Sequence, residues 1–569
     1  MPASRPRRNP TSILRALERL RTTFGSEAAA ARLGALRALE RRALPRAAEV
    51  LRLHELLCFA RAYPDDRKVL ARVERMLGRF AARADLRRHA RRLTDSGVAG
   101  TSFHYRFFAP TARWLATRWP DRLALDWREF ENAGRVETWL PLLAHGAEIP
   151  ALDEYDMPLR DWIRRMRGPR ESEAGFLIGR LGRFPMDDHA RETLYDELDP
   201  PLVLSPGPGT PTRTHAKLRR PDAAPAFQRG PLSRERPAPG DVLRLRPRRV
   251  RLVSAREGAR LIDLAREAMA TRSRDLDVFS YGNPRDVRML DWEDGLQFAC
   301  IGAIPGRRLL LEAVYGYLTL KNGVPVGYVL TSALFGSAEI AYNVFDTFRG
   351  AEAGWIYARV LAMTRHLFGS DTFTIFPYQL GEGNDEAIES GAWWFYQKMG
   401  FRPRERTTLR LMRAELRRLG RRPQHRSSLG TLRRLAGANL YLSLGRERDD
   451  VIGELPLPSV GLRLMRYLGG RFGVDREAGA RACAREAASL LGVRSFAGWS
   501  AGEREAWARW APLVRVLPGL ARWSAAERRA LVAVIRAKGG RFESEFVRRF
   551  DRHAKLRRAV ATIARREPT

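Results

Sequence analysis

The amino-acid sequence predicts an α+β protein of several domains, in which a central α/β domain with a mixed sheet is flanked by mostly helical domains. Three observations lead to this prediction. Alternating apolar residues and glycine turns fill residues 245–450, apolar residues recur at helical spacing on either side, and prolines interrupt residues 196–244. With 569 residues, the chain is long enough for about three or four domains of ordinary size.

Changes in composition along the chain give the expected domain boundaries. We expect a disordered basic tail at 1–10, an N-terminal helical domain at 11–195, a Pro-rich linker or strap at 196–244, a central domain at 245–450 and a C-terminal helical domain at 451–569. Inside the central domain, residues 404–436 are rich in Arg and Leu, which indicates a helical insertion before the last strand. Ser500 with Glu503, and Ser524 with Glu527, have the spacing of capping boxes and predict two helix starts in the last domain.

The composition limits the function classes. The formal charge is +36, and only six of the 101 basic residues are lysine, a bias that a GC-rich genome also produces. The three cysteines are far apart and in no metal-like spacing, so we expect no metal site and a reducing compartment. No run of apolar residues is long enough to span a membrane, and the basic start lacks an apolar segment after it. We therefore expect a cytoplasmic protein.

One stretch of the central domain has the pattern of a strand, a glycine-containing loop and a helix. Residues 338–345 alternate as a strand does, residues 348–355 read Phe-Arg-Gly-Ala-Glu-Ala-Gly-Trp, and apolar residues then recur at helical spacing until Gly369. Such a turn directs backbone N–H groups and the positive end of a helix dipole toward one point. The stretch therefore predicts a phosphate-binding loop that faces a cleft.

Two further stretches connect this pattern to a known superfamily. An Asn-Gly turn at 322–323, between alternating apolar residues, predicts a β-hairpin ahead of the loop, and residues 392–401 read Ala-Trp-Trp-Phe-Tyr-Gln-Lys-Met-Gly-Phe. In order and spacing, residues 245–405 resemble the GNAT superfamily of acyl-CoA-dependent N-acyltransferases. The resemblance implies acetyl-CoA or another acyl-CoA as co-substrate and an amine as acceptor: a small metabolite, a lysine, a protein N-terminus or an aminoacyl group.

The resemblance also implies roles for particular residues. Tyr396 matches the tyrosine that donates a proton to the leaving sulfur, and Glu339 or Asp346 is the candidate base for the attacking amine. The expected cofactor-binding residues are Arg349, Gly350, Ala351, Glu352, Ala353, Gly354 and Glu389. Two of these depart from the family pattern: Glu352 stands where Gly is usual, and Glu389 stands where Asn is frequent. If Glu352 faces the cofactor, its replacement by Gly should tighten acyl-CoA binding.

Three functions are compatible with these patterns. The first is an active N-acyltransferase, and the second is a GNAT-like fold that has lost catalysis and serves as a binding or scaffold module. The third is a nucleic-acid-associated protein whose arginine-rich flanks carry the function. Binding of acyl-CoA would separate the first two from the third, and turnover would separate the first from the second.

Overall fold

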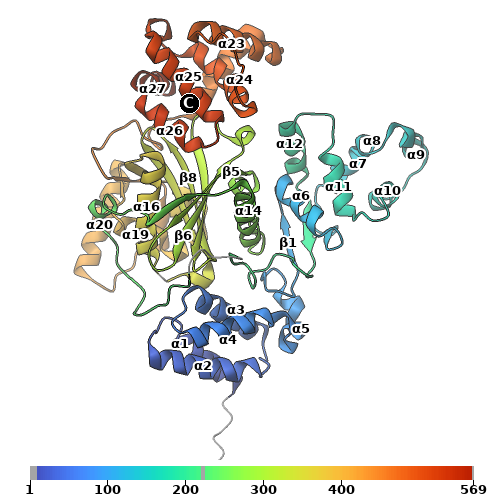
Figure 1. Cartoon of the computed structure of the whole chain (residues 1–569), viewed down its shortest axis with the longest axis vertical. Coiled ribbons are helices and arrows are strands. Elements are labelled where there is room, and N and C mark those ends of the chain that lie inside the picture. Colours follow the sequence, from blue (N-terminus) through green and yellow to red (C-terminus); the bar gives the residue numbers. More distant parts are fainter. Residues whose placement is uncertain (1–8, 219–223, 351, 567–569) are drawn as a thin grey trace, which may run out of the picture.

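A computed structural model describes residues 9–218, 224–350 and 352–566. It confirms an α+β chain with a large mixed sheet and helical regions before and after it (Figure 1). Residues 1–8 of the predicted basic tail lie outside the described part, and helix α1 begins at Pro10.

The N-terminal helices pack into a bundle below the sheet in the view of Figure 1. Leu17, Leu36 and Leu53 are buried in its core, in agreement with the helical spacing of the leucines. The helices of this bundle are α1(Pro10–Arg19), α2(Ser26–Glu40), α3(Ala47–Ala62), α4(Arg67–Gly78) and α5(Ala84–His89). The same core continues into one face of the central sheet, so the bundle is packed directly against it.

Residues 103–204 form a second N-terminal unit with a core of its own. It contains a three-stranded antiparallel sheet in the order β1-β3-β2, with strands β1(Phe103–Arg106), β2(Leu123–Leu125) and β3(Pro201–Leu204). Its helices are α6(Ala109–Arg118), α7(Ala133–Thr138), α8(Leu140–Leu143), α9(Ile149–Glu154), α10(Leu159–Met166), α11(Glu173–Leu181) and α12(Asp188–Leu198). The sequence predicts one helical domain at 11–195 and a linker from 196, whereas β3 lies inside that linker range. Strands this short show too few alternations to be recognised.

The Pro-rich segment after β3 is laid along its neighbours. The backbone N–H of Leu218 donates to the carbonyl of Gly323 at 2.9 Å, and the N–H of Ala226 donates to Asn322 Oδ1 at 2.8 Å. The N–H of Gln228 donates to the carbonyl of Pro64 in the N-terminal bundle at 2.7 Å. The described residues of this segment therefore form a strap between the bundle and the sheet, and the strap ends in helix α13(Pro239–Val242).

The central sheet has nine strands in the order β11-β12-β10-β9-β8-β7-β6-β5-β4. Neighbouring strands are antiparallel except β9 and β10, which are parallel. The strands are β4(Arg249–Leu252), β5(Gly282–Asp291), β6(Leu296–Ala303), β7(Ala313–Lys321), β8(Val324–Leu334), β9(Ser337–Val344), β10(Thr372–Ile375), β11(Arg402–Pro403) and β12(Leu440–Ser443). At the hairpin between β7 and β8, Asn322 and Gly323 both have positive φ, 50° and 76°, which confirms the predicted Asn-Gly turn.

Helices cover both faces of this sheet (Figure 1). Helix α16(Ala353–Phe368) lies on one face and connects the parallel strands, and α14(Ala255–Ala270) lies on the other. The shorter helices are α15(Asp277–Ser280), α17(Pro377–Leu380), α18(Asp385–Ser390) and α19(Ala392–Lys398). Between β11 and β12 lie helices α20(Arg406–Arg421) and α21(Leu429–Ala436), inside the range predicted as a helical insertion.

The C-terminal helices pack at the opposite end of the sheet from the N-terminal bundle (Figure 1). They are α22(Pro458–Phe472), α23(Arg476–Leu491), α24(Ala501–Val516), α25(Ala525–Gly539), α26(Glu543–Arg552) and α27(Ala554–Arg566). Ser500 and Ser524 cap α24 and α25, and each capping box is closed by the expected glutamate, Glu503 or Glu527. Both predicted helix starts are therefore confirmed.

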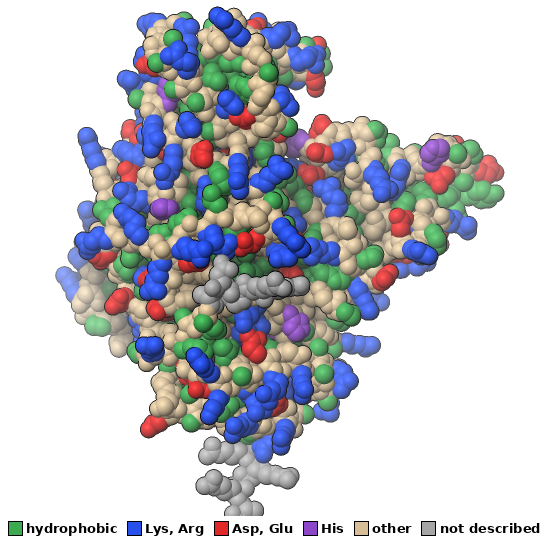
Figure 2. Space-filling model, viewed as in Figure 1, with side chains coloured by type: hydrophobic (Ala, Val, Ile, Leu, Met, Phe, Trp, Pro, Cys, Tyr) green, Lys and Arg blue, Asp and Glu red, His purple; other side chains and the backbone are tan. Residues whose placement is uncertain are grey.

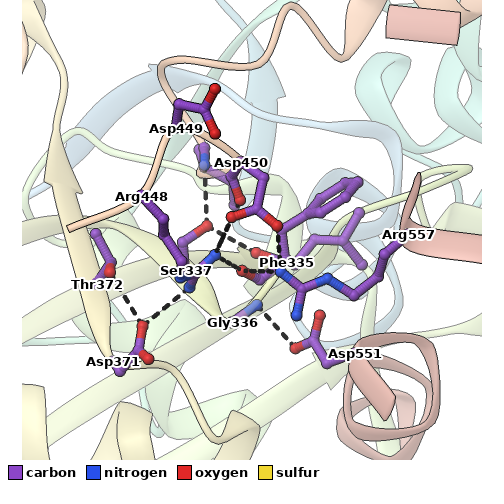
Figure 3. A network of polar contacts seen from close by, with 12 residues as sticks. Phe335, Gly336, Ser337, Asp371, Thr372, Arg448, Asp449, Asp450, Asp551 and Arg557 are labelled. Carbon is purple, nitrogen blue, oxygen red and sulfur yellow. Dashed lines mark hydrogen bonds and ion pairs between the residues drawn. The ribbon is translucent and has the colours of Figure 1, made fainter. Parts of the chain in front are cut away.

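A polar network fixes these helices to the sheet (Figure 3). Asp450 accepts hydrogen bonds from Arg448, at 2.8 Å, and from Arg557 of α27. In the turn between β8 and β9, the N–H of Gly336 donates to Asp551 of α26 at 2.9 Å. Burial raises the pKa of Asp450, but the hydrogen bonds from the two arginines outweigh it and lower the pKa overall. The network joins three segments that are distant in the sequence.

Basic side chains are spread over the face of the molecule shown in Figure 2. Lys and Arg lie over most of this face, with Asp and Glu side chains among them. In the described part of the chain, no helix is long and apolar enough to cross a membrane.

Candidate functional site

The strand–loop–helix pattern predicted around Gly350 is confirmed. Strand β9 ends at Val344, a short 3₁₀ turn follows at Asp346–Phe348, and α16 begins at Ala353. Gly350 has φ 80°, a left-handed conformation that glycine adopts without strain. Ala351 lies outside the described residues. No side chain in the described part of the chain caps the N-terminus of α16, so its first N–H groups are available to an anion.

Strands β9 and β10 pair over a short distance only. Their register runs from Ser337 with Thr372 to Glu339 with Thr374, and β9 then continues to Val344 without a strand partner on that side among the described residues. An unpaired strand edge presents free N–H and C=O groups. The edge of β9 beyond Glu339 is therefore able to bind an extended ligand that contains amides.

A cavity of about 410 Å³ lies at this open edge. Its walls are the end of β9, the loop before α16, and helices α17 to α19. The lining residues are Tyr342, Asn343, Val344, Arg349, Gly350, Ala353, Gln379, Asn384, Glu386, Ala387, Glu389, Ser390, Ala392, Phe395 and Tyr396. The cavity thus brings together five of the predicted site residues, from two stretches that are separate in the sequence: Arg349, Gly350, Ala353, Glu389 and Tyr396.

Tyr396 lies in α19 and is almost fully buried. Its ring packs edge-on against Tyr357 of α16, with the ring centroids 5.5 Å apart. Burial raises the pKa of Tyr396, and a backbone hydrogen bond from Tyr342 offsets part of this rise. The hydroxyl is therefore protonated at neutral pH and lies at the open edge of β9, where it can donate a proton to a group in the cavity.

Arg349 is held at the cavity by carboxylates on either side of it. Its guanidinium pairs with Asp346 at 2.8 Å and with Glu386 of α18. Asp346 is largely exposed and does not line the cavity, so its contact with the site is through Arg349. From the N-terminal bundle, Arg21 donates to the carbonyl of Thr347 at 2.6 Å, which fixes the turn before Arg349.

Glu352 is directed away from the cavity. Its carboxylate accepts from the ammonium of Lys321 at 2.8 Å, and both side chains are buried. Gly354 also faces elsewhere: a Cβ there would meet the Cγ atom of Arg236 in the strap at 2.9 Å. Neither residue lines the cavity. The predicted repulsion between Glu352 and a bound phosphate has no basis in this geometry, because the carboxylate faces a cation instead.

Glu339 lies on the other side of the sheet. Side chains alternate along a strand, and Tyr342, three residues further, packs against Tyr357 of α16. Glu339 therefore points to the opposite face and does not line the cavity. Burial raises the pKa of Glu339 to about 7, and the carboxylate of Glu312 adds to the rise.

Sequence reasoning missed several polar residues of the cavity. Tyr342 and Asn343 belong to the predicted strand, but the sequence does not indicate that its edge is open there. The Oδ1 atom of Asn343 is buried and has no hydrogen-bond partner in the described part of the chain. Glu386 was also missed. It lies three residues before Glu389 on a short helix, and residues at this spacing share a helix face, so the spacing could have indicated it.

Comparison with known protein families, with curated protein sequences and with solved structures gives no match. Among the described residues, no group of three or more His, Cys, Asp or Glu side chains is placed to hold a metal ion.

Proposed function

We propose that the chain is an N-acyltransferase that transfers an acyl group, acetyl or longer, from acyl-CoA to an amine. One observation carries the proposal: Arg349 and Tyr396, which the resemblance to the GNAT superfamily assigned to the two ends of the donor, line one cavity. The two residues belong to stretches that are 47 positions apart in the sequence.

The start of α16 is suited to bind the phosphate end of the donor. The helix has sixteen residues and an uncapped N-terminus, and Gly350 and Ala353 line the cavity beside the cation of Arg349. Free N–H groups, the helix dipole and a guanidinium together favour a pyrophosphate. Glu352 does not oppose it, because its carboxylate is paired with Lys321.

The pantetheine arm of CoA contains amides, and the open edge of β9 offers backbone partners for them. Tyr342, Asn343 and Val344 line the cavity along this edge. An extended arm that adds to the edge as a strand does would run from the start of α16 toward Tyr396. This course brings the thioester sulfur to the phenol.

The chemistry requires two proton transfers. The neutral amine attacks the thioester carbonyl, the C–S bond breaks, and Tyr396 donates its proton to the leaving thiolate. The proton lost by the amine passes to a carboxylate or to water. The bases expected from the sequence, Glu339 and Asp346, do not line the cavity. Two other carboxylates do, those of Glu386 and Glu389. Glu386 is paired with Arg349 and Arg274. We assign the base to Glu389.

Thermal shift of the full chain against a panel of acyl-CoAs tests the donor, and turnover with a panel of amines tests the transfer. Stabilisation by acyl-CoA together with turnover supports the proposal. Stabilisation without turnover on any amine supports a GNAT-like binding or scaffold module instead. Glu389→Gln should slow turnover with little change in acyl-CoA binding, and a rate equal to wild type would refute its role as the base.

A second candidate function, nucleic-acid binding, is favoured by the surface of α20. Five arginines recur at intervals of three or four residues along this helix, are exposed, and form no ion pair with any described carboxylate: Arg406, Arg410, Arg413, Arg417 and Arg421. They form a stripe on one helix face, which suits a line of phosphates. Replacing three of them by Gln should weaken binding of duplex DNA or RNA and lower its salt dependence; if no salt-dependent binding exists, this function is excluded.

A further inference from the structure

Three arginines surround a small void behind the turn that precedes Arg349. Arg61 comes from α3 of the N-terminal bundle, Arg213 from the strap, and Arg272 follows the end of α14. The void is also lined by Cys58, Ala216, Val324, Pro325, Thr347 and Phe348. It thus lies where the bundle, the strap and the sheet meet.

The described residues balance the positive charge at this void only in part. Arg213 pairs with Glu55 at 3.3 Å, and this is the one ion pair that the three arginines make within the described residues. Arg61 donates to the carbonyl of Thr214 at 2.7 Å, and Arg272 donates to the carbonyl of Ala268 at 2.7 Å. The guanidinium of Arg272 also lies over the ring of Phe345, 3.8 Å from its centroid. Neither a carbonyl group nor a ring carries a net charge, so Arg61 and Arg272 have no carboxylate partner among the described residues.

The donors of these arginines are also incompletely used. The Nε atoms of Arg61 and Arg272 are buried without a hydrogen-bond partner. Burial and the neighbouring guanidinium of Arg213 lower the pKa of Arg272 well below its usual value. A buried unpaired charge costs several kcal/mol, and a buried donor without a partner adds to that cost. An anion in the void would supply the missing negative charge.

We propose that this void binds a small inorganic anion of the size of chloride. The void measures about 10 Å³, which is room for a single sphere of the size of a water molecule. A tetrahedral phosphate, with four oxygens around one centre, needs more space. Water fits but does not neutralise the charge. The site is distinct from the cavity at Tyr396, and the proposal does not depend on acyl-CoA.

The anion would lie beside the turn that leads into α16. Arg213 donates to Thr347 Oγ1 at 2.7 Å, and Thr347 and Phe348 both line the void. Without an anion, repulsion among the three guanidinium groups would act on this turn and on its contacts with the bundle. The anion is therefore expected to stabilise the junction of the three segments.

Thermal unfolding of the full chain in chloride tests the site. Chloride replaces gluconate at constant ionic strength, so that general screening stays the same. We expect the Tm of the wild type to rise by about 2–4 °C as chloride saturates the site. Arg272→Met should lose this rise, and its Tm in gluconate should equal or exceed that of the wild type. Arg260→Met, which changes an exposed arginine of α14, should respond to chloride as the wild type does.

Anomalous diffraction from wild-type crystals grown in bromide gives a second readout that needs no variant. A bromide peak among Arg61, Arg213 and Arg272 would support the proposal even if Arg272→Met failed to fold. An equal response of Arg272→Met to chloride, the absence of a chloride effect on the wild type, or a void that holds no bromide would overturn it. Stabilisation by phosphate but not by chloride would also contradict a site of this size.

Discussion

Lys321 and Glu352 form a buried ion pair, with the ammonium 2.8 Å from the carboxylate, between the end of β7 and the start of α16. The ammonium also lies over the rings of Tyr63, from the N-terminal bundle, and Trp355, at 5.1 and 5.2 Å from their centroids. The pair thus joins the bundle, the hairpin and the helix whose N-terminus faces the cavity. It also explains why a glutamate is tolerated in a loop that we propose to bind phosphate.

Replacing only one member of this ion pair should cost more stability, relative to its share of the pair, than replacing both members together. Lys321→Met or Glu352→Leu should each lower the free energy of unfolding by about 3–5 kcal/mol for a fully buried pair, because one charged group is left without its partner. The double variant Lys321→Met with Glu352→Leu should lose less than the two single losses added together. Urea unfolding of the four proteins measures the coupling. Additive losses would show that the two side chains do not interact.

A further variant, Glu352→Gly, tests the position of Glu352 relative to the donor. The sequence alone predicts tighter acyl-CoA binding for Glu352→Gly, on the condition that the carboxylate faces the phosphates. Because the structure pairs the carboxylate with Lys321, we now expect no gain in affinity, and a lower Tm. A lower Kd for acyl-CoA in Glu352→Gly, measured by calorimetry, would restore the first interpretation.

The elements around the site could be predicted because their signals are local. Alternation identifies β9, two glycines mark the loop, and Asn-Gly identifies the hairpin. The direction of the side chains could not be predicted, because it depends on distant partners. Glu352 turns toward Lys321, 31 residues earlier in the chain. Alternation places Glu339 opposite Tyr342, but which face carries the cavity depends on where α19 packs.

Outside the site, too, elements with local sequence signals could be predicted, and contacts between distant segments could not. The bundle and the C-terminal helices follow from leucine spacing and capping boxes. The three-stranded sheet at 103–204 does not, since its strands have three or four residues each and pair over long separations in the sequence. The strap could be recognised from its prolines, but its contacts with Asn322 and Pro64 are tertiary. The void between Arg61, Arg213 and Arg272 is likewise formed only when three separate segments meet.

Arg349 should contribute directly to donor binding. Arg349→Gln removes the cation of the cavity, and a charge-assisted hydrogen bond of about 1.5–3 kcal/mol to a phosphate would be lost. We expect Kd for acyl-CoA to rise by about 10- to 100-fold, with a smaller change for a donor analogue that lacks the pyrophosphate. Asp346→Asn is the matched control, because it removes an exposed partner of Arg349 outside the cavity and should not weaken binding. Equal affinities for Arg349→Gln and wild type would place the phosphates elsewhere.

Glu339 should affect how the stability of the fold depends on pH, and it should not affect turnover. Its folded-state pKa of about 7 lies above the usual 4.5, so the folded protein holds the proton more tightly than the unfolded chain. The resulting stabilisation is complete below about pH 4.5 and is lost as pH rises through about 7. Glu339→Gln should therefore be more stable than wild type above pH 7, by about 3 kcal/mol, and similar near pH 4.5. Its kcat should match wild type; a large loss of kcat with acyl-CoA binding intact would reinstate Glu339 as the base.

Tyr396 provides the most direct test of acyl transfer. Its ring fills space against Tyr357 and Phe401, with centroids 5.5 and 5.8 Å away, while its hydroxyl lies at the cavity. Tyr396→Phe keeps the ring and removes the proton donor, so folding and the Kd for acyl-CoA should be preserved. If the phenol protonates the leaving thiolate, kcat should fall by about 10²–10⁴-fold.

Tyr357→Phe is the control for this prediction. The hydroxyl of Tyr357 is buried, has no hydrogen-bond partner within the described residues and does not line the cavity, so turnover should be unchanged. A second readout separates acid catalysis from packing, because a donor whose leaving thiol has a lower pKa needs less help from the acid and should suffer a smaller loss in Tyr396→Phe. A uniform loss for all donors, or no loss at all, would remove Tyr396 from the role of general acid.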